Sequence, residues 1–161
     1  MKLALPHITG PAFRLTPEVI ERALAEAEAS PRRRIILPMH RSPESVVQRM
    51  LNFLLPGTYI RPHLHPLPHA TETIQVLRGT MHFFLFNDSG HITERHELSA
   101  GETGLIDIEP NLWHGFVIPA EPTVILEIKR GPYDSQYDKV FAPWAPEEGT
   151  EQVQPYLASL R

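Results

Sequence analysis

The sequence predicts an all-β fold, an antiparallel sandwich or small barrel, preceded by one short N-terminal helix. Short apolar runs of β-type recur from residue 35 onward, with turn residues between them. The chain holds 17 prolines and 9 glycines, which suits many short elements joined by fixed turns better than a helical bundle. A length of 161 residues fits one domain that buries about two-thirds of its unfolded surface.

One amphipathic helix is expected near the N-terminus. Thr16 is a residue type that caps helices, Pro17 suits the first helical position, and Glu18 places an acid in the first turn. Apolar residues then follow at helical spacing and stop before Ser30, which predicts a helix of about three turns. These apolar residues are Val19, Ile20, Ala23, Leu24 and Ala27.

Strand-like segments fill the middle of the chain. Gly79 separates two of them like a hairpin turn, and the turn NDSG at 87–90 leads into an alternating strand with one solvated face. The expected strands are 35–37, 48–55, 73–77, 81–86, 91–98, 105–108, 113–118 and 123–128.

Three regions follow from these elements. Residues 1–34 form an N-terminal extension with the helix, and residues 35–130 form the barrel. Residues 131–161 lack periodicity, so we expect an irregular C-terminal segment packed on the barrel, where its aromatic side chains find a partner surface.

Composition excludes several classes of function. The net charge is −4 and no basic stripe with interleaved aromatics occurs, so no nucleic-acid partner is expected. No apolar run approaches the roughly 18 residues of a membrane span, so no membrane partner is expected. The absence of cysteine rules out disulfides, thiolate ligands and a cysteine nucleophile. The N-terminal residues do not read as a signal peptide, which makes the cytoplasm the expected location.

The stretch GTYIRPHLHPLPHATETIQVLRG at 57–79 concentrates potential metal ligands. They are His63, His65, His69 and Glu72. An H-x-H pair alone is weak evidence, because chance supplies about 0.5 such pairs in a chain with nine histidines. The bounding glycines and the strand-like segment at Glu72 lower the chance expectation to roughly one in a thousand.

The chemistry of these residues favours a metal site. Residues i and i+2 of a strand face the same side, so His63 and His65 can both point into a barrel. Glu72 shares its strand face with Ile74, and an acid in such surroundings must be paired or coordinated. His114 lies between a turn and an apolar strand and supplies a third imidazole. Three neutral imidazoles and a carboxylate bind a divalent first-row metal and leave one or two positions open.

The spacing resembles the first motif of the cupin superfamily, in which a glycine, an H-x-H pair, a glutamate and a second glycine follow one another. Gly57, His63, His65, Glu72 and Gly79 match this order, with a longer loop of six residues before the glutamate. The segment IEPNLWH at 108–114 resembles the second motif, commonly I-P-P-G-T-W-H.

That resemblance implies a cupin barrel, also called a double-stranded β-helix or jelly roll. Carried over residue by residue, it implies that His63, His65, Glu72 and His114 bind the metal. The longer loop leaves His69 or Gln75 as alternatives to Glu72. The metal can be iron, manganese, nickel or zinc, and the sequence does not choose among them.

Three longer segments are similar to the WbuC family of cupin-fold metalloproteins. They are SPRRR at 30–34, QRMLNFLLPGTYIRPHLHP at 48–66 and EIKRGPYDSQYDKVFAPWAPEEG at 127–149. Genes of that family often accompany genes for O-antigen or other surface-polysaccharide synthesis. The resemblance therefore implies a homodimer that acts on or binds a sugar or sugar nucleotide in lipopolysaccharide biosynthesis, by metal Lewis-acid chemistry.

Whether the chain is an enzyme stays open at this point. A metal-dependent isomerase or epimerase and an iron-dependent dioxygenase are both compatible with the ligand set. The alternative is a non-catalytic protein that uses its metal to bind or sense a small molecule, either a sugar or a carboxylate.

Four residues are candidates for contacts with the substrate. Arg33 and Arg34 could clamp an anion, because guanidinium groups pair bidentately with phosphate. His82 and Tyr133 are candidates for contacts in or over the barrel. Solvation of the arginines and plain packing of the other two side chains are the alternatives.

Overall fold

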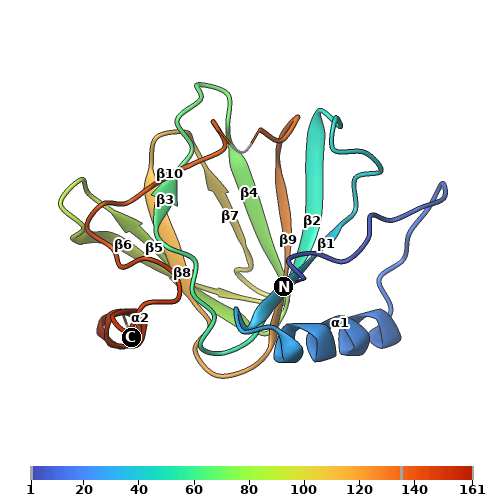
Figure 1. Ribbon diagram of the computed structural model, residues 1–161, viewed down its shortest axis with the longest axis horizontal. Helices are drawn as coiled ribbons and strands as arrows, with labels where there is room; N and C mark the ends of the chain where they lie inside the picture. The colour runs from blue at the N-terminus through green and yellow to red at the C-terminus, as the bar shows by residue number, and fades with distance from the viewer. Residues whose placement is uncertain (1, 135, 161) are drawn as a thin grey trace.

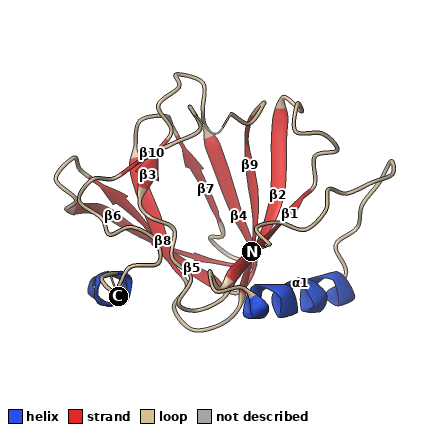
Figure 2. Ribbon diagram, viewed as in Figure 1, coloured by secondary structure: helices blue, strands red, loops and turns tan. Residues whose placement is uncertain are grey.

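The computed structural model describes residues 2–134 and 136–160 of the chain. It confirms the expected all-β architecture with a short N-terminal helix: strands dominate, and one helix lies on each side of them (Figure 2). The elements are α1 (Pro17–Ala29), β1 (Arg34–Pro38), β2 (Val47–Leu54), β3 (His63–Leu64), β4 (Glu72–Arg78), β5 (Thr80–Phe86), β6 (Ile92–Ser99), β7 (Leu105–Ile108), β8 (Trp113–Val117), β9 (Thr123–Arg130), β10 (Val140–Phe141) and α2 (Val153–Ser159).

The strands form two antiparallel sheets of five strands each. One sheet has the order β1-β2-β9-β4-β7, and the other has the order β10-β3-β8-β5-β6. The inner faces of the two sheets enclose a core that includes Ile74, Val76, Met81, Phe83 and Ile125. This arrangement places residues of β3, β4, β8 and β9 around one interior.

Helices cover the outer faces (Figure 1). Helix α1 packs on β1 and β2 through Ala23, Leu24 and Ala27, which are the apolar positions expected from its sequence. Helix α2 packs through Val153 and Leu157 against a cluster on the outer face of β5 and β8. Because β5 is covered on both sides, its sequence MHFFLF is apolar on both faces. No helix in the described part of the chain has the length and apolar character needed to cross a membrane.

The prediction of a hairpin around Gly79 is wrong. Strands β4 and β5 flank this glycine but belong to different sheets. One residue is too short for a hairpin loop, so the chain turns a corner from one sheet to the other instead. Gly79 has a φ of +80°, and a Cβ there would lie 2.7 Å from Thr123 Oγ1, so both the backbone and the space require glycine.

The C-terminal segment differs from the irregular structure expected for it, since it contains β10 and α2. Strand β10 pairs with β3, where Phe141 lies opposite His63. Trp144 packs on Phe86, with ring centroids 5.0 Å apart. Tyr133 and Tyr137, in contrast, are about half exposed (56% and 57%), so only part of this segment's aromatic surface is covered by the barrel.

Candidate metal centre

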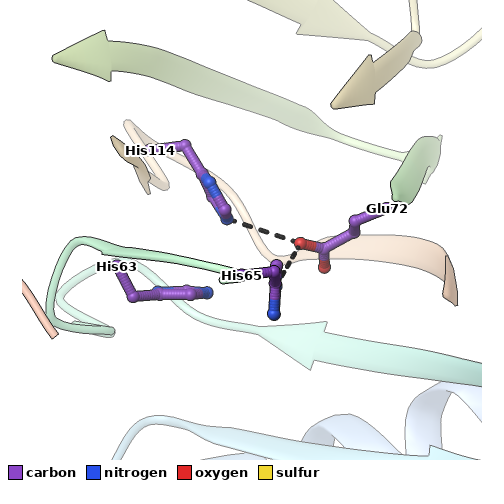
Figure 3. A group of neighbouring side chains, drawn as sticks. All are labelled: His63, His65, Glu72 and His114. Carbon is purple, nitrogen blue, oxygen red and sulfur yellow. Dashed lines mark hydrogen bonds and ion pairs between the residues drawn. The ribbon is translucent and has the colours of Figure 1, made fainter. Parts of the chain in front are cut away.

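Four side chains converge inside the barrel, and they are the four that the sequence indicated (Figure 3). Strand β3 begins with His63, His65 follows it, β4 begins with Glu72, and β8 carries His114. The register pairs His63 directly with His114, while Glu72 reaches the group from the facing sheet. Their ligand atoms all lie within 4.8 Å of one another, and each residue is 7% exposed or less.

The alternatives to Glu72 lie elsewhere. His69 is exposed in the loop before β4, and Gln75 is exposed because an odd offset from Glu72 turns it to the other face of the strand. The longer loop after His65 therefore still delivers Glu72 to the centre.

Backbone carbonyls determine which nitrogen of each imidazole carries its hydrogen. Nδ1 of His63 lies 3.1 Å from the carbonyl of Arg61, and Nδ1 of His114 lies 2.9 Å from that of Leu112. Nδ1 of His65 bonds the carbonyl of Asp138. A carbonyl can only accept, so Nδ1 must donate in all three rings. A neutral imidazole then keeps a lone pair on Nε2, the arrangement typical of metal-bound histidine.

With all three rings neutral, the atoms that they and Glu72 turn toward one another are all acceptors. Nε2 of His65 lies 3.0 Å from Oε2 of Glu72, and Nε2 of His114 lies 3.4 Å from the same oxygen. Nε2 of His114 is buried and has no hydrogen-bond partner among residues 2–134 and 136–160. Lone pairs at these distances repel unless a cation or a proton lies between them. The group therefore fits a divalent metal.

Charge and burial act differently on each ligand. Burial lowers the pKa of His63 well below its ordinary value, with help from the nearby His114. Burial also opposes the charged form of His65, yet its contacts with Glu72 raise its pKa. Burial alone would raise the pKa of Glu72, but His114 and His65 hold it well below the usual range. Contact with Glu72 therefore favours the protonated form of His65, whereas burial favours the neutral form of His63.

Two further charged residues at this interior, Glu127 and Lys129, were missed in the sequence. The register pairs Lys129 with Glu72 and Glu127 with Ile74, so all of them face the same side of the sheet. Their side chains are 16% and 10% exposed. The sequence signal for these two residues is an acid and a base two positions apart in TVILEIKR, on the same strand face as Ile125. The strand has apolar residues on both faces, so the sequence does not show which face points inward.

These two residues belong to one polar network. Asn52 Nδ2 donates a 2.9 Å hydrogen bond to Oε2 of Glu127, and Lys129 Nζ lies 2.9 Å from Oδ1 of Asp138. Burial and the charge of Glu72 raise the pKa of Glu127. Burial opposes the charge of Lys129, but Glu127, Glu72 and Asp138 raise its pKa.

Two cavities adjoin the centre. A cavity of about 390 Å³ is lined by His65, Lys129, Tyr137 and Asp138, among others. A smaller cavity of about 40 Å³ touches the other three members of the group. The four candidate ligands are therefore divided between two cavities, with His65 on the larger one and His63, Glu72 and His114 on the smaller one.

The candidate substrate residues are not gathered at this centre. His82 lies on the outer face of β5, where its Nε2 is 3.5 Å from Oε2 of Glu97. Tyr133 is exposed and stacks near Lys129, whose Nζ lies 5.9 Å from the ring centroid. Arg33 is half-buried with a φ of 57°. Arg34 is 3% exposed, and both oxygens of Glu148 accept hydrogen bonds from it at 2.9 and 2.8 Å.

Replacing Arg34 should destabilise the fold. Its guanidinium ties β1 to the C-terminal segment through Glu148 and also donates to the carbonyl of Tyr59 at 2.7 Å. We expect Arg34→Met to lower the free energy of unfolding by about 3 kcal/mol, the low end for a broken buried ion pair, because Glu148 keeps some contact with solvent. Arg33→Met, the matched control, should stay within about 0.5 kcal/mol. Denaturant unfolding measures both, and equal effects would contradict this assignment.

Comparison with known proteins agrees with the architecture. A family model described as Domain of unknown function (DUF6016) matches residues 15–98. No curated protein matches the chain. Among solved structures, an oxalate oxidase in complex with the substrate analogue glycolate superposes with a TM-score of 0.54 at 18% identity, covering 71% of this chain and 58% of that one.

Two other structures show the same likeness. The capsular polysaccharide assembling protein CapF from Staphylococcus aureus has a TM-score of 0.55 at 18% identity, covering 66% of this chain and 31% of that one. A structure of the DMSP lyases RdDddP and RnDddQII has a TM-score of 0.51 at 18% identity, with coverages of 68% and 52%. This chain thus spans less than two-thirds of the length of each. Together they show that the fold is that of the cupins.

Proposed function

Because the chain belongs to the DUF6016 family, whose description assigns no function, we propose one from the site: a metal-dependent cupin that acts on a sugar or sugar nucleotide. The observation that carries this proposal is the buried group of three imidazoles and one carboxylate, whose ligand atoms all lie within 4.8 Å of one another. His63, His65, Glu72 and His114 would hold the metal. Bound there, a divalent metal supplies Lewis-acid polarisation of a hydroxyl or carbonyl oxygen.

The chain's own residues prepare the site for such a substrate. The carbonyls of Arg61 and Leu112 orient His63 and His114, so the lone pairs are directed before anything binds. Burial of the ligands keeps bulk water away, which strengthens every electrostatic contact inside. Glu127 adds a titratable group beside the ligands. A second titratable group favours catalysis over simple sensing.

Several observations support the substrate class. The cavity of about 390 Å³ beside His65 falls within the roughly 300–1,000 Å³ of small-molecule sites. The similarity of three segments to the WbuC family links the chain to surface polysaccharides, and CapF, a capsular polysaccharide assembling protein, shares the fold.

A cytoplasmic homodimer without nucleic-acid or membrane partners is part of the same proposal. Pairing is supported by large apolar side chains that stay 46–57% exposed near the C-terminal segment. They are Tyr133, Tyr137, Val140 and Phe141.

The proposal is tested by incubating metal-loaded and metal-stripped protein with a panel of uridine and thymidine diphosphate sugars in D₂O. We expect metal-dependent loss of a carbon-bound proton signal or a new sugar product in the NMR spectrum, as isomerisation or epimerisation requires. Saturable binding without chemical change would instead indicate a metal-dependent binding protein. Neither binding nor turnover with any member of the panel would overturn the sugar-nucleotide assignment.

A further inference from the structure

The small cavity joins the candidate metal centre to a second carboxylate. Its polar lining combines His63, Glu72 and His114 with Asn52, Glu127 and Lys139, and the remaining walls are apolar. A buried water needs on the order of 10–15 Å³ of such space. The cavity of about 40 Å³ therefore accepts a few waters or the end of a larger molecule. Whatever enters it therefore meets the ligand group, Glu127 and Lys139.

Glu127 is held so that one oxygen keeps its acceptor capacity. Asn52 is 4% exposed and donates to Oε2 at 2.9 Å. Lys129 Nζ lies 3.7 Å from Oε1, an ion-pair distance that is longer than a hydrogen bond. Lys129 itself is engaged by Asp138 at 2.9 and 3.2 Å. Oε2 is thus anchored, while Oε1 receives no hydrogen bond from residues 2–134 and 136–160 and can accept one.

The chemistry of a carboxylate decides which groups suit this cavity. Lys129 beside Oε1 favours the ionised form of Glu127 against the opposing effects of burial and Glu72. An ionised carboxylate only accepts hydrogen bonds, so it favours a hydroxyl or a water and disfavours an ether, a carbonyl or another carboxylate. We propose, building on the metal-dependent function above, that Glu127 selects a hydroxyl-bearing ligand by accepting the hydrogen bond of a hydroxyl group taken into the small cavity. Asn52 is the positioning residue that holds Glu127 for this contact.

Two small probes test this selection. Glycolate and acetate each carry one carboxylate and one negative charge, but only glycolate has a hydroxyl. The full chain loaded with cobalt(II) is titrated with each, and the visible absorption of the cobalt reports binding. We expect glycolate to bind more tightly, and Glu127→Gln to shrink the glycolate-to-acetate affinity ratio about tenfold, the size of one hydrogen bond to a charged group. The altered site charge affects both probes alike and cancels in the ratio.

Further variants separate the outcomes. Glu102→Gln makes the same chemical change on an exposed loop and should leave the ratio unchanged. Asn52→Ala should also reduce the glycolate-to-acetate affinity ratio, because it frees Oε2 of Glu127. This variant provides the test if Glu127→Gln fails to fold. Equal affinities in the native protein, or an unchanged ratio in Glu127→Gln, would overturn the inference. A native chain that takes up no cobalt would instead overturn the metal-binding function itself.

Discussion

The double variant His63→Ala/His114→Ala is expected to lose the bound metal. The two rings face each other across β3 and β8 with centroids 4.5 Å apart, and together they supply half of the donor group. Loss of an outer-sphere partner of a metal ligand already costs about 10–100-fold in affinity. Removing two ligands should therefore cost at least about 100-fold.

Elemental analysis of the purified proteins measures this loss. The native protein should carry about one equivalent of iron, manganese, nickel or zinc, in line with a single four-residue centre. Metal that binds only the native state adds about 2.7 kcal/mol of stability at 100 times its dissociation constant. Chelator should therefore lower the melting temperature of the native protein and leave that of the variant unchanged.

The matched control is His91→Ala/His96→Ala. His91 is exposed in the turn before β6, and the side chain of His96 on β6 is 39% exposed, with its Nε2 3.0 Å from Oε2 of Glu94. Neither belongs to the group of four candidate ligands. They test whether histidine number alone governs metal uptake. If the native protein, the control and the double variant all have the same metal content, the proposed metal centre is wrong. The identity of the metal then distinguishes the candidate reactions. Iron would favour a reaction with dioxygen, whereas zinc or manganese would favour Lewis-acid catalysis.

Metal affinity is also expected to fall as the pH falls, because an incoming metal must displace any proton that a ligand imidazole carries. Glu72 raises the pKa of His65, whereas burial lowers that of His63. An incoming metal is therefore expected to displace a proton from His65 and none from His63. Each displaced proton corresponds to about tenfold in metal affinity per pH unit.

The stability of the metal-free protein should change in the opposite sense. A histidine whose pKa is raised in the folded state contributes stability below its unfolded pKa, and that stability is lost as the pH rises through the folded value. The metal-free protein should therefore be less stable at pH 8 than at pH 6, because Glu72 loses its counter-charge on His65. Protonation of Glu72 affects stability only at lower pH, because the pKa of this carboxyl is well below its usual range. Metal should stabilise the protein most at pH 8.

Calorimetric titration in two buffers of different ionisation enthalpy counts the released protons. Glu72→Gln removes the charge that raises the pKa of His65, so it should flatten the pH dependence while lowering affinity. A native protein that binds metal equally at pH 5 and pH 8 would contradict imidazole ligation. Release of three protons at pH 6 would contradict the assigned difference between His63 and His65.

Prediction from the sequence succeeded for features that depend on residues close together in the chain. Helix α1 follows from the Thr16-Pro17-Glu18 start and the apolar spacing after it. The spacing of His63 and His65 on one strand face predicts a shared direction, and an acid at an inward position predicts a partner. Helix α2 escaped detection because seven residues with an internal Pro155 do not form a stable helix alone. It is held by packing of Val153 and Leu157 on the barrel.

The sequence by itself determined the fold class, the helix α1 and the four residues of the candidate centre, since strand alternation and ligand chemistry are carried by short segments. Only the tertiary structure decided what surrounds that centre. Sheet pairing places Lys129 opposite Glu72, and burial engages Arg34 with Glu148 rather than with a ligand. The inward face of Thr123–Arg130 also depended on pairing with two neighbours. Such relations join residues far apart in the chain, and no local pattern encodes which partner each one meets.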